Sequence, residues 1–360
     1  MTTTIDTIPL FDAATPAAAP IPPRTDAPTA RLLLPSSATE EEWHQVRRSG
    51  IGGSDVAAIL GLDKYRGPRH VYEAKHGRDV EGDNEAMEFG RELEDVIARS
   101  FSRRSGIAIS TPPGTLVHTE HAWMLANVDR YALDEGGAVV APVECKNRSE
   151  YQADDWEDGV PDSPAIQAHW YMAVGGWDYA WVAALIGGNR LRYHRLERDE
   201  ELIGYLTETC GGWYQRHVVD GFPPPADGLE ATKDLLGRLW TAKPEDIVEV
   251  DRDRAEELRA ERLRLRAQIE ALETALTTVE NEMRLLNGES EVAKVGKSVA
   301  WSWKQNGNFA PSRFRKAYPE LAAELTTLVE ALDMDRLKAE HPDIYTEFRA
   351  RVLRVPAKEL

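Results

Sequence analysis

The stretch VDRYALDEGGAVVAPVECKN, Val128–Asn147, carries the residues that decide the fold and the chemistry expected of this chain. Asp129 stands fifteen residues before Glu144, the first residue of a Glu-Cys-Lys triplet. The second half of the stretch is predicted as a strand, on which side chains alternate, so Glu144 and Lys146 share a face. The turn-forming Asp-Glu-Gly-Gly between the halves predicts a hairpin that brings Asp129 beside Glu144. Two carboxylates and one ammonium on one face predict a site for a hard cation such as Mg²⁺.

The Glu-Cys-Lys triplet has a second interpretation, because such charge pairs are also common on strand faces that water covers. The apolar residues Val139, Val140 and Val143 favour a buried strand instead. Charged side chains on a buried strand need a partner or a function, because burying an unpaired charge is costly. The pattern by itself leaves both interpretations open.

Composition narrows the class of protein. The chain has 360 residues, enough for one large domain with appendages or for two domains. Its formal charge of −18 disfavours a protein held to DNA by general electrostatics, although local basic patches remain compatible with it. The two cysteines, Cys145 and Cys210, have no paired spacing, so neither a zinc site nor an iron–sulfur cluster nor a disulfide framework is predicted.

Targeting signals are not evident in the sequence. No apolar run approaches the roughly 20 residues that a transmembrane helix needs. The first residues lack the basic stretch and apolar core of a secretory signal. The sequence therefore predicts a cytoplasmic protein with no membrane association.

The order of elements predicts an α/β domain over residues 39–226. The preceding residues, 1–38, are rich in Ala, Pro and Thr and are interpreted as a disordered tail. Helices are predicted near residues 40–49, 54–60, 84–103, 163–174 and 199–219. Strands are predicted near residues 107–109, 115–117, 124–131, 138–146, 179–186 and 190–196.

The C-terminal third has a different pattern. After a linker or helix at 227–250, residues 251–287 carry apolar side chains in a heptad pattern: Leu258, Leu265, Ile269, Leu272, Leu276, Val279, Met283 and Leu286. This pattern indicates a coiled coil that oligomerises or binds a partner, or else a helical hairpin that packs on its own domain. Residues 288–360 are predicted to form a small β-hairpin followed by helices.

Three further features add to the chemistry. Glu94 lies on the predicted helix 84–103, where neighbouring carboxylates compete with it for any acidic role. Gln167 lies on the predicted helix 163–174, which could cover the site, although a plain surface glutamine fits the pattern equally well. In RRSGIGGSDVAAILG, a helix that begins near Ser54 offers free backbone amides to an anion, with Arg47 or Arg48 nearby. An ordinary loop with a serine cap is the alternative for this last motif.

In combination and in this order, these features resemble the YqaJ-type viral recombinases, a lambda-exonuclease-like family of the PD-(D/E)XK nuclease superfamily. The similar segments, within roughly residues 40–225, read IGGSDVAAILGL, YRGPRHVYEAKHG, FGRELED, NVDRY, PVECKN and GGWYQRHVVDGFPPP. The resemblance implies a restriction-endonuclease-like core, with a mixed β-sheet flanked by helices. The sequence departs from the family at Val128, where the signature often has a proline.

The resemblance also implies a catalytic set. Asp129 and Glu144 would bind Mg²⁺ or Mn²⁺, with the backbone carbonyl of Cys145 as a further ligand. Lys146 would be the catalytic lysine, and Gln167 would match the glutamine of the family's motif.

Two further roles follow from the same resemblance. Glu94 would hold a second metal ion or its water molecules. Ser54 and either Arg47 or Arg48 would hold the 5′ phosphate of a DNA end.

The activity implied by the resemblance is a metal-dependent 5′→3′ exonuclease that degrades linear duplex DNA and leaves 3′ single strands for phage-type recombination. Its partners would be duplex DNA ends and a single-strand annealing protein, in the cytoplasm of a bacterial host, and a homo-oligomer remains open. The alternatives are an endonuclease that cuts internal or structured sites, and a non-catalytic module that binds DNA ends or a partner.

Overall fold

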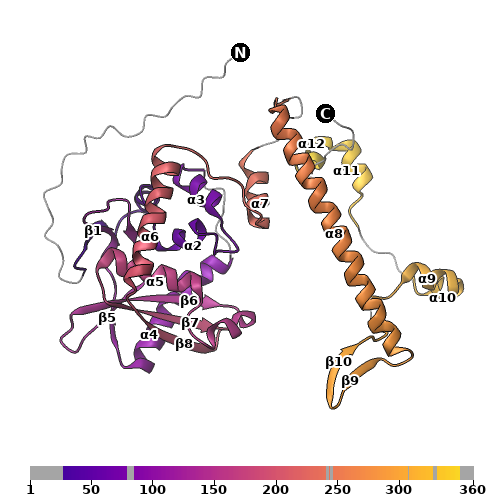
Figure 1. The fold of residues 1–360 in the computed structure, drawn as a ribbon, viewed down its shortest axis with the longest axis horizontal. Helices are drawn as coiled ribbons and strands as arrows, with labels where there is room; N and C mark the ends of the chain where they lie inside the picture. Colours follow the sequence, from indigo (N-terminus) through magenta and orange to yellow (C-terminus); the bar gives the residue numbers. More distant parts are fainter. Residues whose placement is uncertain are drawn as a thin grey trace. The chain divides into compact units, whose positions relative to one another are not determined.

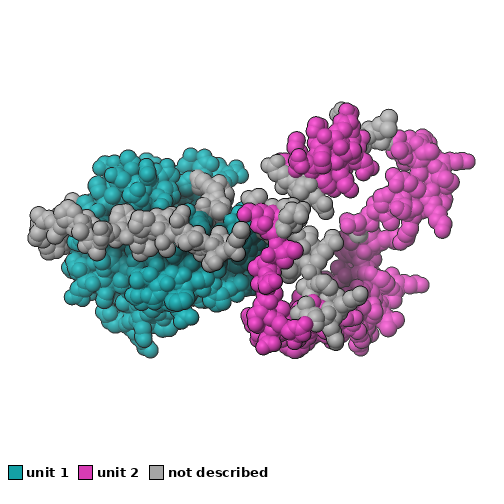
Figure 2. Space-filling view, turned by 90° about the horizontal axis from the view of Figure 1, so that it is seen from above, with its two compact units in different colours: residues 1–241 teal, residues 242–360 magenta. Residues whose placement is uncertain are grey.

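The computed structural model describes residues 27–78, 85–240, 243, 246–306, 308–326 and 331–348. The chain divides into two compact units, Met1–Thr241 and Ala242–Leu360 (Figure 2). None of the helices within the described residues is long and apolar enough to cross a membrane.

The first unit is built on a mixed five-stranded sheet in the order β2-β5-β6-β7-β8 (Figure 1). Its strands are β2 (Ala108–Ser110), β5 (Arg130–Leu133), β6 (Val139–Arg148), β7 (Tyr179–Ile186) and β8 (Arg190–Glu197). Only β6 and β7 pair in parallel, and the other neighbours are antiparallel. A parallel pair needs a crossover connection, and helix α5 (Asp162–Gly175) lies in the segment that joins β6 to β7.

Helices cover both faces of this sheet, and each face has its own core. On one face, Trp170 and Met172 of α5 pack in the same cluster as Val182 of β7. On the other face, Phe101 of helix α4 (Glu85–Ser105) packs in a cluster with Val143 of β6. Side chains alternate along a strand, so each buried strand supplies both cores. The predicted α/β class, with a mixed sheet flanked by helices, is confirmed.

A second, smaller sheet corrects two predictions. It has the order β1-β3-β4, with β1 (Ala30–Pro35), β3 (Gly114–His118) and β4 (Leu125–Ala126). The predicted disordered tail of residues 1–38 therefore ends too late in the chain, because β1 pairs antiparallel with β3. This strand could not be predicted because its six residues are too few to show a period. The predicted strand 124–131 is also wrong as one element, because β4 and β5 belong to different sheets. The rest of the predicted tail, residues 1–26, lies outside the described residues.

The predicted helices of this unit are found with shifted ends, and some others were not predicted. Helix α1 (Glu40–Arg48) begins with the Thr39–Glu42 capping box, and α2 (Gly53–Ile59) follows it. Helix α6 (Glu200–Trp213) continues as one π-helical segment, Tyr214–Val219. The elements that were not predicted are α3 (Pro68–Lys75) and two short 3₁₀ turns (Glu150–Gln152 and Asp154–Trp156). Helix α7 (Glu230–Leu239) lies within residues 227–250, which were predicted as a linker or helix.

The second unit contains one long helix, α8 (Arg252–Asn287), which Asp251 caps and Gly288 follows. The heptad segment is thus a single continuous helix, not a hairpin within these residues (Figure 1). The predicted β-hairpin follows as β9 (Val292–Val295) and β10 (Ser298–Ser302). The remaining helices are α9 (Pro311–Ala317), α10 (Pro319–Glu324), α11 (Met334–Glu340) and α12 (Pro342–Glu347).

Candidate active site

The β5–β6 hairpin brings the carboxylates of the Val128–Asn147 stretch together. In its register Arg130 lies opposite Val143, so Asp129 extends the pairing toward Glu144. The backbone N–H of Cys145 donates to Asp129 Oδ2 at 2.7 Å, which fixes the carboxylate against β6. The N–H and C=O of one strand residue point to the same side. The Cys145 carbonyl therefore also faces the side of Asp129.

Helix α5 completes a polar network on the same face. Lys146 Nζ forms an ion pair with the Glu144 carboxylate and donates a hydrogen bond of 2.8 Å to Gln167 Oε1. Gln167 Nε2 in turn donates to Glu144 Oε1 and to the Tyr171 hydroxyl, both at 2.8 Å. The lysine and the glutamate are therefore held in one geometry by a glutamine 21 residues further along the chain.

The carboxylates of Asp129 and Glu144 offer the oxygen donors that a divalent cation requires. Glu144 Oε2 is buried and has no hydrogen-bond partner among the described residues. Burial raises the pKa of Asp129 well above its usual value, and the charges of Glu144 and Glu94 add to this effect. A cation beside these groups would satisfy the unpartnered oxygen and relieve the repulsion. Mg²⁺ usually takes one or two protein carboxylates and keeps several water molecules, so the residues present fit it.

Glu94, which was predicted to hold a second metal ion or its water molecules, forms an ion pair with an arginine. Its helix α4 packs on the face of Val143, opposite the face that carries Glu144, and its carboxylate forms an ion pair with Arg130. Arg130 also donates to the backbone carbonyl of Asp129. Among the residues that the structure describes, no three His, Cys, Asp or Glu side chains form a group that could hold a metal ion. Glu94 therefore contacts the site through Arg130.

Arg148 is a candidate that the sequence reasoning missed. It lies two residues after Lys146 on the strand β6, so it shares the face of Glu144 and Lys146. Its guanidinium is half-buried and donates to the Asn147 carbonyl at 2.9 Å, and no carboxylate of the described residues forms an ion pair with it. Burial lowers the pKa of Arg148, while the negative charge of Glu144 opposes the shift. The alternation Glu-x-Lys-x-Arg was the signal that could have identified it.

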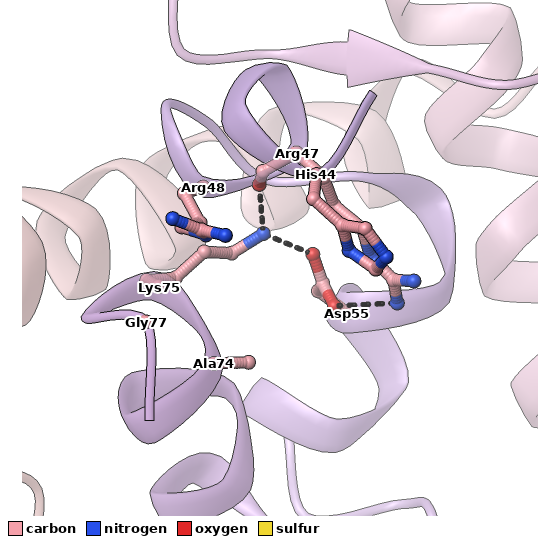
Figure 3. Close-up of a pocket in the computed structure, with 7 residues that line it drawn as sticks. All are labelled: His44, Arg47, Arg48, Asp55, Ala74, Lys75 and Gly77. Atoms are coloured by element: carbon pink, nitrogen blue, oxygen red, sulfur yellow. Dashed lines mark hydrogen bonds and ion pairs between the residues drawn. The ribbon is translucent and has the colours of Figure 1, made fainter. Parts of the chain in front are cut away.

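A basic pocket lies beside the N-terminal helices (Figure 3). Its volume is about 270 Å³, and its lining residues are His44, Arg47, Arg48, Asp55, Ala74, Lys75 and Gly77. Both predicted arginines therefore line one pocket. Ser54 is exposed and does not line it, although it adjoins Asp55, which does. The carboxylates of the β5–β6 hairpin do not line the pocket either, so the two sites are distinct.

A buried ion pair organises this pocket. Lys75 Nζ donates to Asp55 Oδ2 at 2.6 Å and to the Arg47 carbonyl at 2.7 Å (Figure 3). Asp55 also lies 3.6 Å from Arg66 and 3.9 Å from Arg47. Burial by itself would raise the pKa of Asp55, but the charges of Lys75, Arg66 and Arg47 outweigh it and hold that pKa well below its usual range. Lys75 was not singled out in the sequence, because its partner lies 20 residues away.

Gly53, at the start of α2, packs closely against Tyr171 and Gln167 of the polar network. A Cβ atom placed on it would lie 2.6 Å from Tyr171 Cε1 and 3.0 Å from Gln167 Cγ. We expect Gly53→Ala to lower the free energy of unfolding by about 1–3 kcal/mol, because the buried Tyr171 ring must shift. Activity should fall as well, because Gln167 orients Lys146. Urea unfolding gives the free energy directly.

The matched control for Gly53 is Gly204, an exposed helical glycine of α6 whose Cβ would meet no atom within 4 Å. Gly204→Ala should keep or raise the stability, because alanine favours a helix by about 1 kcal/mol over glycine. Equal effects at the two positions would contradict the close packing assigned to Gly53.

The chain is similar to known proteins in sequence. The family model of the YqaJ-like viral recombinase domain matches residues 42–178. A protein of Bacillus subtilis (strain 168), described as "Uncharacterized protein YqaJ", is 31% identical over 327 residues, which are 88% of this chain and 93% of that protein.

Solved structures also resemble the chain over about half of its length. An alkaline exonuclease (LHK-Exo) from Laribacter hongkongensis is 17% identical, with a TM-score of 0.41, over 50% of this chain and 93% of that one. A phage related exonuclease from Haemophilus somnus 129PT is 14% identical, with a TM-score of 0.37, over 49% of this chain and 99% of that one.

Proposed function

This chain belongs to the YqaJ-like viral recombinase family, and on that premise we propose that it is a metal-dependent deoxyribonuclease that degrades linear duplex DNA from its 5′ ends. The observation that carries the proposal is the buried, unpartnered Oε2 of Glu144 beside Asp129, with Lys146 held by Gln167 on the same face. A surface charge pair would not need a glutamine from another element to hold it.

Asp129, Glu144 and the backbone carbonyl of Cys145 would hold Mg²⁺, or Mn²⁺ in its place. When bound, such an ion polarises a phosphate and lowers the pKa of a coordinated water molecule. Metal binding by the wild-type chain should raise its melting temperature, because a ligand that binds only the folded state stabilises it.

The protein's own residues would supply orientation and charge. Lys146 would orient the attacking water molecule or stabilise negative charge on the phosphate in the transition state. Gln167 would keep Lys146 in place through the 2.8 Å hydrogen bond. Glu94 would act through Arg130, which contacts the Asp129 backbone. A direct role for Glu94 in binding a second metal ion would require its ion pair with Arg130 to open.

The basic pocket supports the choice of a DNA end as substrate. Arg47 and Arg48 line it, and guanidinium groups bind phosphate through charge-assisted hydrogen bonds. Ser54 would add a hydroxyl donor from the first turn of α2. Because the chain carries a net charge of −18, such local groups must attract DNA where the overall charge does not. The 3′ single strand left by digestion would be the substrate of a single-strand annealing protein.

The experiment that tests this function compares linear duplexes with and without a 5′ phosphate, each with Mg²⁺, with Mn²⁺ and with a chelator, beside a closed circular duplex. We expect progressive release of 5′-end label that depends on the metal ion, is faster on phosphorylated ends and does not occur on circles. Cleavage of circles would indicate an endonuclease instead. End binding without cleavage in either metal ion would indicate a binding module.

Arg148 gives a prediction of its own. We expect Arg148→Ala to lower kcat/KM on duplex DNA by about 10- to 100-fold, mainly through KM, because a charged hydrogen bond to a phosphate is worth roughly 1.5–3 kcal/mol. Steady-state kinetics over a range of DNA concentrations measure this effect. Stabilisation by Mg²⁺ should be retained in this variant.

The control for Arg148 is Arg192→Ala, which removes an exposed arginine from the edge strand β8 of the same sheet. It should change kcat/KM by less than about twofold, because surface charge alone contributes little. A loss of the same size in both variants would show that Arg148 contributes only to the general field of the protein.

A further inference from the structure

Helix α8 carries an apolar seam that is exposed within the second unit and is interrupted once, at Arg262. The seam consists of Leu258, Leu265, Ile269, Leu272, Leu276, Val279, Met283 and Leu286. Exposure of the seam's large side chains other than Met283 ranges from 44% for Leu265 to 71% for Leu286. An apolar stripe along a 36-residue helix is unusual for a monomer and marks an interaction surface.

We propose that this seam binds a second copy of the same chain, with the two α8 helices antiparallel. In this register Ile269 packs against Leu272 of the second copy, Leu265 against its Leu276, and Leu258 against its Met283. The proposal concerns the second unit alone and does not depend on the nuclease activity proposed above.

The length of the seam favours a second copy over the chain's own C-terminal helices. At 1.5 Å per residue, α8 is about 54 Å long. Helices α9–α12 have only 6 or 7 residues each, or about 10 Å. A helix of equal length and matching period is therefore the partner that fits, and another α8 has both.

Arg262 determines the orientation of the pair. It occupies the seam position seven residues before Ile269, where the other heptads carry apolar side chains. In a parallel pair, residues of this type face their own counterparts, so two guanidinium groups would meet in the apolar core at a high cost. In the antiparallel register Arg262 lies opposite Val279, and the two arginines lie about 25 Å apart. Each can then extend its charged group to water.

Antiparallel pairing places more opposite charges together along the flanks of the seam than parallel pairing does. On one flank the first half carries Arg259 and Arg266, and the second half carries Glu273 and Glu280. Antiparallel pairing places each arginine of this flank opposite a glutamate, Arg266 with Glu273 and Arg259 with Glu280.

Arg266 and Glu273 form no ion pair within the described chain, so both are available to a partner. On the other flank Glu261 lies opposite Glu282, and this repulsion occurs twice. Of the attractive pairs, Arg266 with Glu273 is the one that carries the argument, because Glu280 already forms an ion pair with Arg284 in its own helix. Parallel pairing would instead place Arg254 opposite Arg259.

Charge reversal and rescue test the orientation, with the dimer dissociation constant of the full chain measured by sedimentation or light scattering. Arg266→Glu and Glu273→Arg should each raise this constant by at least about tenfold, because each places like charges together twice. The double variant should restore it to within a few fold. In a parallel pair Arg266 would face Glu261, so the double variant would stay weak.

The matched control is Glu270→Arg, three residues from Glu273, exposed and off the seam, which should change the dissociation constant by less than about twofold. A wild-type chain that stays monomeric, an assembly of any other size, or a double variant that is not rescued would overturn the proposal.

Cross-linking checks the register independently. A mixture of Leu258→Cys and Met283→Cys chains, treated with a short bis-maleimide, should give a cross-linked dimer well above the background of the wild type, which contains Cys145 and Cys210. Neither variant alone should exceed that background. Cross-linking of Leu258→Cys with itself would indicate a parallel pair and overturn the proposal.

Discussion

Replacement of Lys146 by alanine is expected to lower the rate of DNA cleavage by about 10³-fold, because an oriented ammonium acts on the water molecule and on the developing phosphate charge. The side chain forms an ion pair with Glu144 and a hydrogen bond with Gln167, so its position is fixed before DNA binds. Single-turnover kinetics on linear duplex DNA with saturating Mg²⁺ measure this loss.

Metal binding should be retained or strengthened in Lys146→Ala, because the lysine competes with a cation for the Glu144 carboxylate. The shift in melting temperature with Mn²⁺ measures this property without reference to activity. Asp129→Asn, by contrast, should lose both the cleavage and most of the thermal shift. Near-normal cleavage by Lys146→Ala would show that the lysine has no catalytic role. The control for the loss of one positive charge is Lys233→Ala, which changes an exposed lysine of α7.

Asp55→Ala is expected to have the largest effect on stability, a loss of about 3–5 kcal/mol in the free energy of unfolding. The Asp55 and Lys75 side chains are each only 2% exposed, and Asp55 is the carboxylate that compensates Lys75, Arg66 and Arg47. Its removal leaves a buried ammonium with the Arg47 carbonyl and two repelling guanidinium groups. Urea unfolding at neutral pH measures the loss.

The double variant Asp55→Leu with Lys75→Met should recover much of that stability, because two apolar side chains leave no buried charge without a partner. It should nevertheless lose any preference for phosphorylated ends, because Arg47 is then no longer held by Asp55. If the double variant is as unstable as Asp55→Ala, packing rather than charge accounts for the loss.

The same pair predicts how stability depends on pH. The pKa of Asp55 is held low in the folded state, so the unfolded chain binds more protons as the pH falls through the ordinary carboxyl pKa of about 4. The stabilisation by Asp55 is therefore fully present above about pH 5 and is lost progressively below about pH 4. The difference in free energy of unfolding between wild type and Asp55→Ala should shrink on going from pH 6 to about pH 3. A constant difference would contradict the assigned cause.

Long-range contacts account for what could not be predicted. The strand β1 is recognisable only through its pairing with β3, more than 70 residues away, because six residues do not establish a period. Glu94 was expected to hold a second metal ion or its water molecules, and its contact with Arg130 could not be predicted because it depends on how α4 packs against the sheet. Gln167 could equally have been a surface residue until the crossover helix α5 placed it on Lys146.

Features that depend on local period and local turns could be predicted from the sequence. These are the β5–β6 hairpin, the shared face of Glu144 and Lys146, the long amphipathic helix α4 and the heptad seam of α8. The contacts between groups that lie far apart in the chain depend on the packing of whole elements. These contacts are Lys146 with Gln167, Glu94 with Arg130, and Asp55 with Lys75. The physical reason is that alternation and helical period fix the direction of a side chain relative to its neighbours in the chain, whereas its partner across the core depends on how whole elements pack.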